Sequence, residues 1–87
     1  MTNTNENNVS IESLGTIQDG RFYLPQWRCG EFDYFCWRNS EGHWWAFEEG
    51  EDSSGRWYRV ALNDAMSFRA LRDAIAFIET HRIKAEK

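Results

Sequence analysis

Apolar residues in the last third of the chain recur at helical spacing. Ser67 is a favourable N-cap, and neither glycine nor proline interrupts the sequence from Ala65 to Lys87. The pattern predicts a helix from about Ser67 to about Lys84. Its buried stripe consists of Phe68, Leu71, Ala74, Ile75 and Ile78.

Aromatic-rich runs bounded by turn residues predict strands upstream of this helix. Phe32–Arg38 and His43–Glu48 flank Asn-Ser-Glu-Gly at 39–42, which is typical of a four-residue hairpin loop. Arg56–Leu62 predicts a further strand. Arg21–Trp27 predicts an edge or interrupted strand, because Pro25 within it cannot donate to a ladder.

The first residues carry a weaker pattern. Residues 1–8 are polar and predict a disordered tail that ends near residue 9. Residues 9–17 predict a short strand or an irregular lead-in, followed by a turn at Asp19-Gly20. Because the predicted strands come first and the single predicted helix comes last, the sequence predicts one α+β domain over residues 10–87. We expect an antiparallel sheet of three to four strands followed by one C-terminal helix packed on one face.

The predicted hairpin has two aromatic faces. A loop at 39–42 sets Arg38 opposite His43, and alternation along the strands then assigns each side chain to a face. One face carries Tyr34, Cys36, Trp45 and Phe47. The other carries Phe35, Trp37, Trp44 and Ala46, with the opposed carboxylates Asp33 and Glu48 at its far end. We expect the Cys36 face to meet the helix, because cysteine is often buried. A register slip of one residue would exchange the faces.

A single helix covers only one face of this sheet. Phe35, Trp37 and Trp44 are therefore predicted to form an exposed patch, and such patches often mark interaction sites. The alternative is that the N-terminal segment folds over this face as a second small core, with Val9, Ile11, Leu14, Phe22 and Leu24.

Charge is distributed unevenly along the 87 residues, whose net charge is −4. Residues 31–52 hold seven acidic side chains and one basic side chain, Arg38. Two interpretations of the dense segment within this region stay open: a solvated loop, or an acidic element that steers the chain toward a basic partner. Its acids are Glu48, Glu49, Glu51 and Asp52.

No catalytic or metal-binding motif stands out. Cys29 and Cys36 lie seven positions apart, and without an export signal we expect a cytoplasmic chain with no disulfide between them. His43 and His81 are distant in sequence and show no zinc-ligand spacing. We therefore expect no metal, no cofactor and no enzymatic activity.

These features favour a small acidic protein-binding module, a non-enzymatic inhibitor or regulator that occupies a partner's surface. Its predicted contact residues are Phe35, Trp37, Trp44, Glu48, Glu49, Glu51 and Asp52. The partner would be a protein with a basic surface or a second copy of the chain. Phage or mobile-element counter-defence, as by anti-CRISPR proteins, is one setting for such a protein. The alternative is a nucleic-acid-binding sheet, because the order of strands and helix from Phe32 to His81 resembles the layout of AP2-type domains. The composition also favours this alternative, because eight of the ten basic residues in the whole chain are arginines, which can form two hydrogen bonds with guanine.

Overall fold

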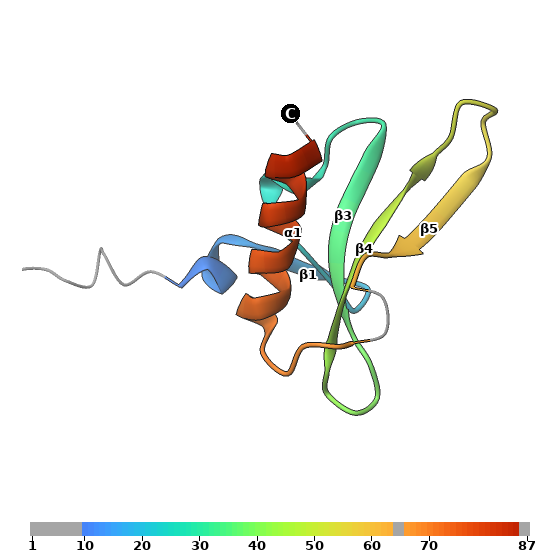
Figure 1. The fold of residues 1–87 in the computed structure, drawn as a ribbon. Helices are drawn as coiled ribbons and strands as arrows, with labels where there is room; N and C mark the ends of the chain where they lie inside the picture. Colours follow the sequence, from blue (N-terminus) through green and yellow to red (C-terminus); the bar gives the residue numbers. More distant parts are fainter. Residues whose placement is uncertain (1–9, 64–65, 86–87) are drawn as a thin grey trace, which may run out of the picture.

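The computed structural model describes residues 10–63 and 66–85 and shows an α+β fold (Figure 1). The sheet contains five strands, more than the three to four predicted: β1 (Thr16–Gln18), β2 (Arg21–Tyr23), β3 (Phe32–Arg38), β4 (Trp44–Glu51) and β5 (Trp57–Ala61). One helix, α1 (Leu71–Ala85), follows the sheet, and two 3-10 turns, η2 (Ile11–Leu14) and η3 (Pro25–Trp27), lie among the first strands. The predicted tail lies outside the described residues.

The strands form an antiparallel meander in the order β1-β2-β3-β4-β5. Asp19 and Gly20 join β1 to β2, and both adopt positive φ angles, of 55° and 78°. Such angles suit the two-residue hairpin turn that Asp-Gly sequences favour. After β2 the chain leaves the ladder at η3, which begins with Pro25, so the strand predicted over 21–27 is half strand and half 3-10 turn.

The register of the β3–β4 hairpin differs from the predicted one by one residue. Arg38 pairs with Trp44, not with His43, so the loop has five residues. The Asn39 side chain accepts hydrogen bonds from the backbone N–H groups of Glu41 and His43, at 2.9 and 3.0 Å, and thereby stabilises the longer loop. Every side chain of β4 consequently lies on the face opposite to the predicted one.

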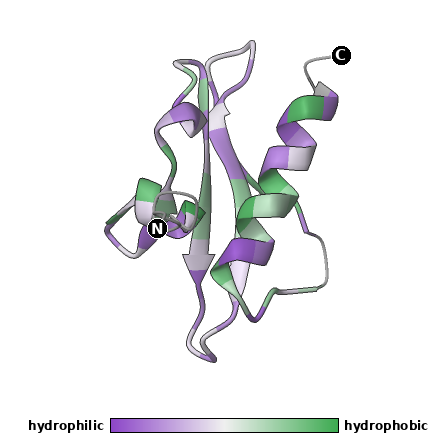
Figure 2. Cartoon of the chain, turned by 90° about the vertical axis from the view of Figure 1, so that its left-hand side faces the viewer, coloured by the Kyte–Doolittle hydropathy of each residue, from purple (hydrophilic) through white to green (hydrophobic). Residues whose placement is uncertain are grey.

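The main core lies between the sheet and α1. Cys36 and Ala46 point from the sheet toward Ala74, Ile75 and Ile78 of the helix, and all five residues are buried. The prediction that Tyr34 and Cys36 face the helix is therefore confirmed, whereas Trp45 and Phe47, which were predicted on the same face, lie on the opposite one. Figure 2 shows the helix lying along one side of the sheet, with apolar colour on the elements that meet there.

Trp27 closes one end of this core. Its side chain is fully buried, and its indole N–H donates to Glu79 of α1 across 2.7 Å. Arg82 donates to the same Glu79 oxygen at 2.9 Å. A buried indole needs such an acceptor, and the bond therefore fixes η3 against the helix.

The segment between β5 and α1 delays the start of the helix to Leu71, four residues after the predicted N-cap. Phe68 exchanges both backbone hydrogen bonds with Trp44, so the chain returns to the sheet before it becomes helical. Asn63 bridges the gap between β5 and Phe68. Its side chain is buried, accepts the Ala46 N–H at 3.0 Å and donates to the carbonyl of Met66.

Candidate functional site

The face of the sheet that turns away from α1 carries a continuous layer of aromatic side chains. We call it the outer aromatic face. Cross-strand pairing places Trp37 beside Trp45 and Phe35 beside Phe47. The members of this face are Tyr23, Phe35, Trp37, Trp45 and Phe47.

Part of this face is packed and part is open. Phe35 is only 2% exposed, because its ring stacks on Phe47 at a centroid distance of 5.1 Å and touches Tyr23 at 5.9 Å. Trp37 remains 41% exposed, and Trp45 is half-buried. The packed rings form a small second core, and the two tryptophans follow it along β3 and β4.

A network of charges crosses the same face. Arg21 donates to both carboxylate oxygens of Glu49, at 3.1 and 3.2 Å, and its guanidinium lies 4.3 Å from the centre of the Phe35 ring. Arg59 donates to Glu49 from the other side at 2.9 Å. Arg28 lies 3.9 Å from the centre of the Tyr23 ring. Arg21 and Arg28 thus pack on aromatic rings, and Arg21 and Arg59 share one carboxylate.

Residues 10–24 do not cover this face, contrary to the alternative raised by the sequence, of which Val9 lies outside the described residues. Phe22 and Leu24 are buried in the core beneath α1. Ile11 and Leu14 of η2 are exposed, and η2 contacts the helix. Among residues 10–63 and 66–85, the elements that leave the sheet therefore pack on the helix side.

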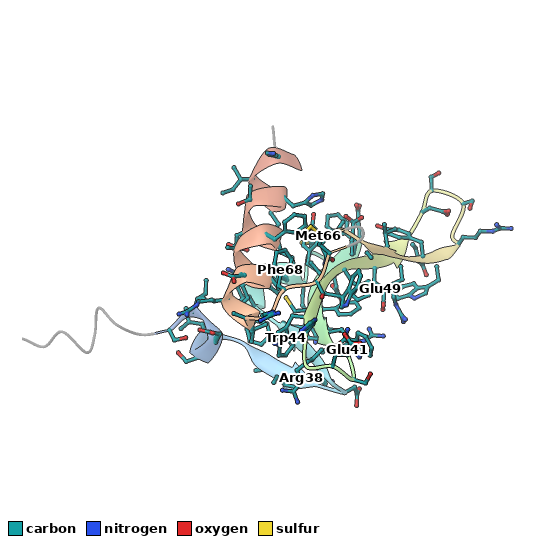
Figure 3. All side chains as sticks on the ribbon, turned by 60° about the horizontal axis from the view of Figure 1, so that its bottom comes forward. Arg38, Glu41, Trp44, Glu49, Met66 and Phe68 are labelled. Atoms are coloured by element: carbon teal, nitrogen blue, oxygen red, sulfur yellow. The ribbon has the colours of Figure 1, made fainter. Side chains whose placement is uncertain are left out.

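The seven predicted contact residues are distributed over both faces. Phe35 and Trp37 lie on the outer aromatic face as predicted, although Phe35 is buried there. Trp44 lies on the helix side, close to Phe68, and packs against the main core, whereas Glu49 projects from the opposite side of β4 (Figure 3). The prediction that Trp44 lies on the outer face was wrong, because the predicted register of the hairpin was off by one residue; the same error assigned Trp45 and Phe47 to the helix side.

The predicted acidic loop is mostly strand. Glu48, Glu49 and Glu51 belong to β4, and Asp52 begins the turn to β5. Asp52 accepts hydrogen bonds from the Ser54 hydroxyl and from the backbone of Ser54 and Arg56, which lowers the pKa of its carboxyl group. Only part of the acidic segment is therefore available to a partner.

An acidic cleft of about 710 Å³ lies at the end of the outer face. Asp33 and Glu49 face each other across β3 and β4 there, in place of the predicted pair of Asp33 with Glu48. Trp57, 62% exposed, stands beside Glu51. The cleft is lined by Glu31, Phe32, Asp33, Glu49, Gly50, Glu51, Asp52 and Trp57, together with Gly30 and Ser53.

Three carboxylates of this acidic cleft are uncompensated. In the described part of the chain, the side chains of Glu31, Asp33 and Glu51 have neither a hydrogen-bond donor nor a cation as partner. They differ in this from Glu49, which two arginines neutralise. The cleft therefore carries negative charge that a cationic ligand could neutralise.

Glu48 belongs to a separate polar cluster on the helix side. The Tyr58 hydroxyl donates to Glu48 at 2.6 Å, and this bond raises the pKa of Tyr58 to about 12. The imidazole of His81 approaches the other Glu48 oxygen to 3.9 Å and packs edge-on against Tyr34. These contacts join α1 to β4 and β5.

The other candidate chemical groups are separated. His43 contacts the Ser67 hydroxyl at 3.1 Å, whereas His81 lies in the cluster around Glu48. Cys36 is buried, and burial raises the pKa of its thiol to about 12, which disfavours the nucleophilic thiolate. Cys29 is exposed, and no disulfide joins it to Cys36. Over the described ranges, no three metal-ligating side chains cluster.

Comparisons of the chain with protein-family models, with curated proteins and with solved structures find no match. None of the helical segments in the described ranges is long and apolar enough to cross a membrane.

Proposed function

We propose that this protein is a non-enzymatic protein-binding module, which inhibits or regulates another protein by occupying part of its surface. The observation that carries the proposal is the outer aromatic face, which no described segment covers. Trp37 and Trp45 lie at its open end, two positions along β3 and β4 from the stacked rings of Phe35 and Phe47. A tryptophan side chain offers a large contact area with only two side-chain torsions to restrict on binding, and tryptophans are enriched among interface hot spots.

The charges around this face favour a protein over a nucleic acid. Arg21 and Arg59 share the one negative charge of Glu49, and the neighbouring acidic cleft repels phosphate. Affinity for nucleic acid rests largely on uncompensated lysines and arginines that displace counterions. A protein interface instead combines an apolar centre with a charged rim. The partner we propose has a basic patch opposite the acidic cleft.

The test is affinity capture from nuclease-treated extracts of the source cells, followed by titration of the purified partner. Trp37→Ser removes an exposed anchor. Ile83→Ser is the matched control, because Ile83 is 56% exposed on α1, away from the sheet. A partner that binds the wild type and Ile83→Ser, but binds Trp37→Ser at least about tenfold more weakly, supports the proposal.

Two results would contradict it. One is equal capture by both variants, each shown to be folded by circular dichroism. The other is tight binding of single-stranded oligonucleotides that weakens steeply with salt, which would favour the nucleic-acid alternative. A sizing column separates a second copy of the chain from a different partner.

The contribution of charge is tested by Glu31→Gln, Asp33→Asn and Glu51→Gln in one variant. These acids have no partners in the described chain, so their removal leaves the internal ion pairs intact. Glu48, Glu49 and Asp52 are unsuitable, because each stabilises the fold. We expect slower association at low salt and a smaller salt dependence, with little change in dissociation.

A further inference from the structure

Within residues 10–63 and 66–85, no strand pairs with the outer side of β5, which is therefore an open edge of the sheet. Strand β5 pairs with β4 on one side and is the last strand of the sheet order. Near its two ends, the backbone N–H of Asp52 donates to the carbonyl of Arg56, and the backbone N–H of Leu62 donates to the carbonyl of Ala46. Antiparallel pairs alternate between hydrogen-bonded and non-hydrogen-bonded positions. The backbone groups of Tyr58 and Val60 therefore point to β4, and those of Trp57, Arg59 and Ala61 point outward.

This edge carries little of the protection that sheet edges usually have. Exposed edges are commonly shortened, bulged, covered, or blocked by proline or charged side chains, and the one charged side chain of β5, Arg59, is bound to Glu49. The opposite edge, β1, has only three residues, whereas β5 has five and lacks proline. The hairpin of β4 and β5 extends away from α1 (Figure 1), and both Trp57 and Val60 are exposed, one on each face of the strand.

The acidic cleft lies beside this edge on the outer face. Trp57 belongs both to β5 and to the wall of the cleft. A strand added at the usual spacing of about 4.8 Å would place a lysine or arginine within reach of the Trp57 ring. Its cationic end could extend across that ring toward Glu51 and Asp33. Aromatic rings and unpaired carboxylates both attract such a cation.

We propose that β5 binds an extended, lysine- or arginine-bearing segment of the partner protein as a sixth, antiparallel strand. This inference rests on the proposed protein-binding function and specifies its mode. Backbone hydrogen bonds to Trp57, Arg59 and Ala61 hold the segment, and the acidic cleft selects its charge. A second copy of the chain is a poorer occupant, because it would bring another set of unneutralised carboxylates to the same edge.

The first test uses a capped octapeptide of alternating arginine and valine. In an antiparallel sixth strand whose arginines share the outer face, the arginine amides point to β5 and the valine amides point away. Methylation of the arginine amide nitrogens should abolish binding measured by calorimetry, while methylation of the valine amides should preserve it. A matched peptide of alternating glutamate and valine should not bind.

Amide exchange locates the complex on the edge. In the free protein, we expect the amides of Trp57, Arg59 and Ala61 to exchange fast and those of Tyr58 and Val60 to exchange slowly. Saturation with the arginine peptide should slow the first three amides at least about tenfold. No peptide binding, or binding without this protection, would overturn the proposal.

A proline variant tests the edge in the protein itself. Ala61→Pro removes an outward N–H and leaves the ladder to β4 intact, and Ala61→Ser is the matched control that keeps the N–H. We expect Ala61→Pro to weaken peptide binding about tenfold and Ala61→Ser to leave it unchanged. If Ala61→Pro does not fold, the methylated peptides still decide the question.

The two proposals fail separately. If the purified partner is lost by Trp37→Ser but retained by Ala61→Pro, the protein-binding function stands and strand addition is wrong. If Ala61→Pro dissociates a dimer of the free protein, a second copy occupies the edge and the proposed occupant is wrong.

Discussion

Asn63 is the residue whose replacement tests the account of the fold most directly. Its buried side chain accepts the Ala46 N–H and donates to the Met66 carbonyl, between the end of β5 and the bridge at Phe68. Asn63→Ala leaves the Ala46 N–H without an acceptor at a position where the residue is fully buried. An unsatisfied buried donor costs about 1–3 kcal/mol.

The second hydrogen bond adds less to the expected loss. Met66 is exposed, so water can replace the Asn63 amide at its carbonyl, and the net contribution of that bond is about 0.5–1 kcal/mol. We therefore expect Asn63→Ala to lower the free energy of unfolding by about 2–3 kcal/mol. For a domain of this size, each kcal/mol corresponds to a fall of about 4–8 °C in Tm.

Urea denaturation followed by tryptophan fluorescence measures this loss, and amide exchange at Ala46 identifies its origin. Asn39→Ala is the matched control. It also removes two bonds from backbone N–H groups, but in a surface hairpin loop where water can replace the amide oxygen. We expect the control to cost about 1 kcal/mol or less. Equal losses of unfolding free energy in the two variants, or unchanged exchange of the Ala46 amide in Asn63→Ala, would refute the conclusion that the Asn63 side chain stabilises the fold through its bond to Ala46.

Two further predictions concern titratable groups. Iodoacetamide should alkylate Cys29 in the native protein and Cys36 only after unfolding, because burial raises the pKa of Cys36 to about 12. Mass spectrometry counts the labels. Equal rates of alkylation of the two cysteines in the native protein would contradict this prediction. The Tyr58 phenol should titrate near pH 12 in ultraviolet absorbance, and Glu48→Gln should return its pKa toward 10. Because the folded pKa is raised, the stability that this bond provides is fully present below pH 10 and is lost as the pH rises toward 12, so urea midpoints should fall over that interval. A midpoint that stays constant there would show that the bond does not contribute to stability.

The strong local patterns in the sequence predicted the central elements. Phe32–Arg38 is a strand with the predicted bounds, because its aromatic run is long and is bounded by turn residues. The helix is present, yet its start was misplaced. Ser67 has the chemistry of an N-cap, but the pairing of Phe68 with Trp44 competes with helix formation at that point. A tertiary contact of this kind has no signature in the local sequence.

The candidate site was only partly predictable, and one loop accounts for the error. Asn-Ser-Glu-Gly fits a four-residue hairpin loop by composition, but the Asn39 side chain stabilises a loop of five. That single residue exchanges the faces of β4 and moves Trp44 and Glu48 to the helix side. Strands β1 and β2 were also difficult to predict, because three residues are too few to show alternation.

The meander order of the strands has a consequence for how the chain folds. Each strand pairs with its neighbour in sequence, so the sheet can assemble through closure of short loops, which is fast. The main core is different, since the bond between Trp27 and Glu79 spans 52 positions. During synthesis, the strands reach solvent before Ala74, Ile75 and Ile78 have left the ribosome. The nascent sheet therefore exposes Cys36 and the surrounding apolar side chains until the helix emerges, and the main core packs only after all five strands have been synthesised.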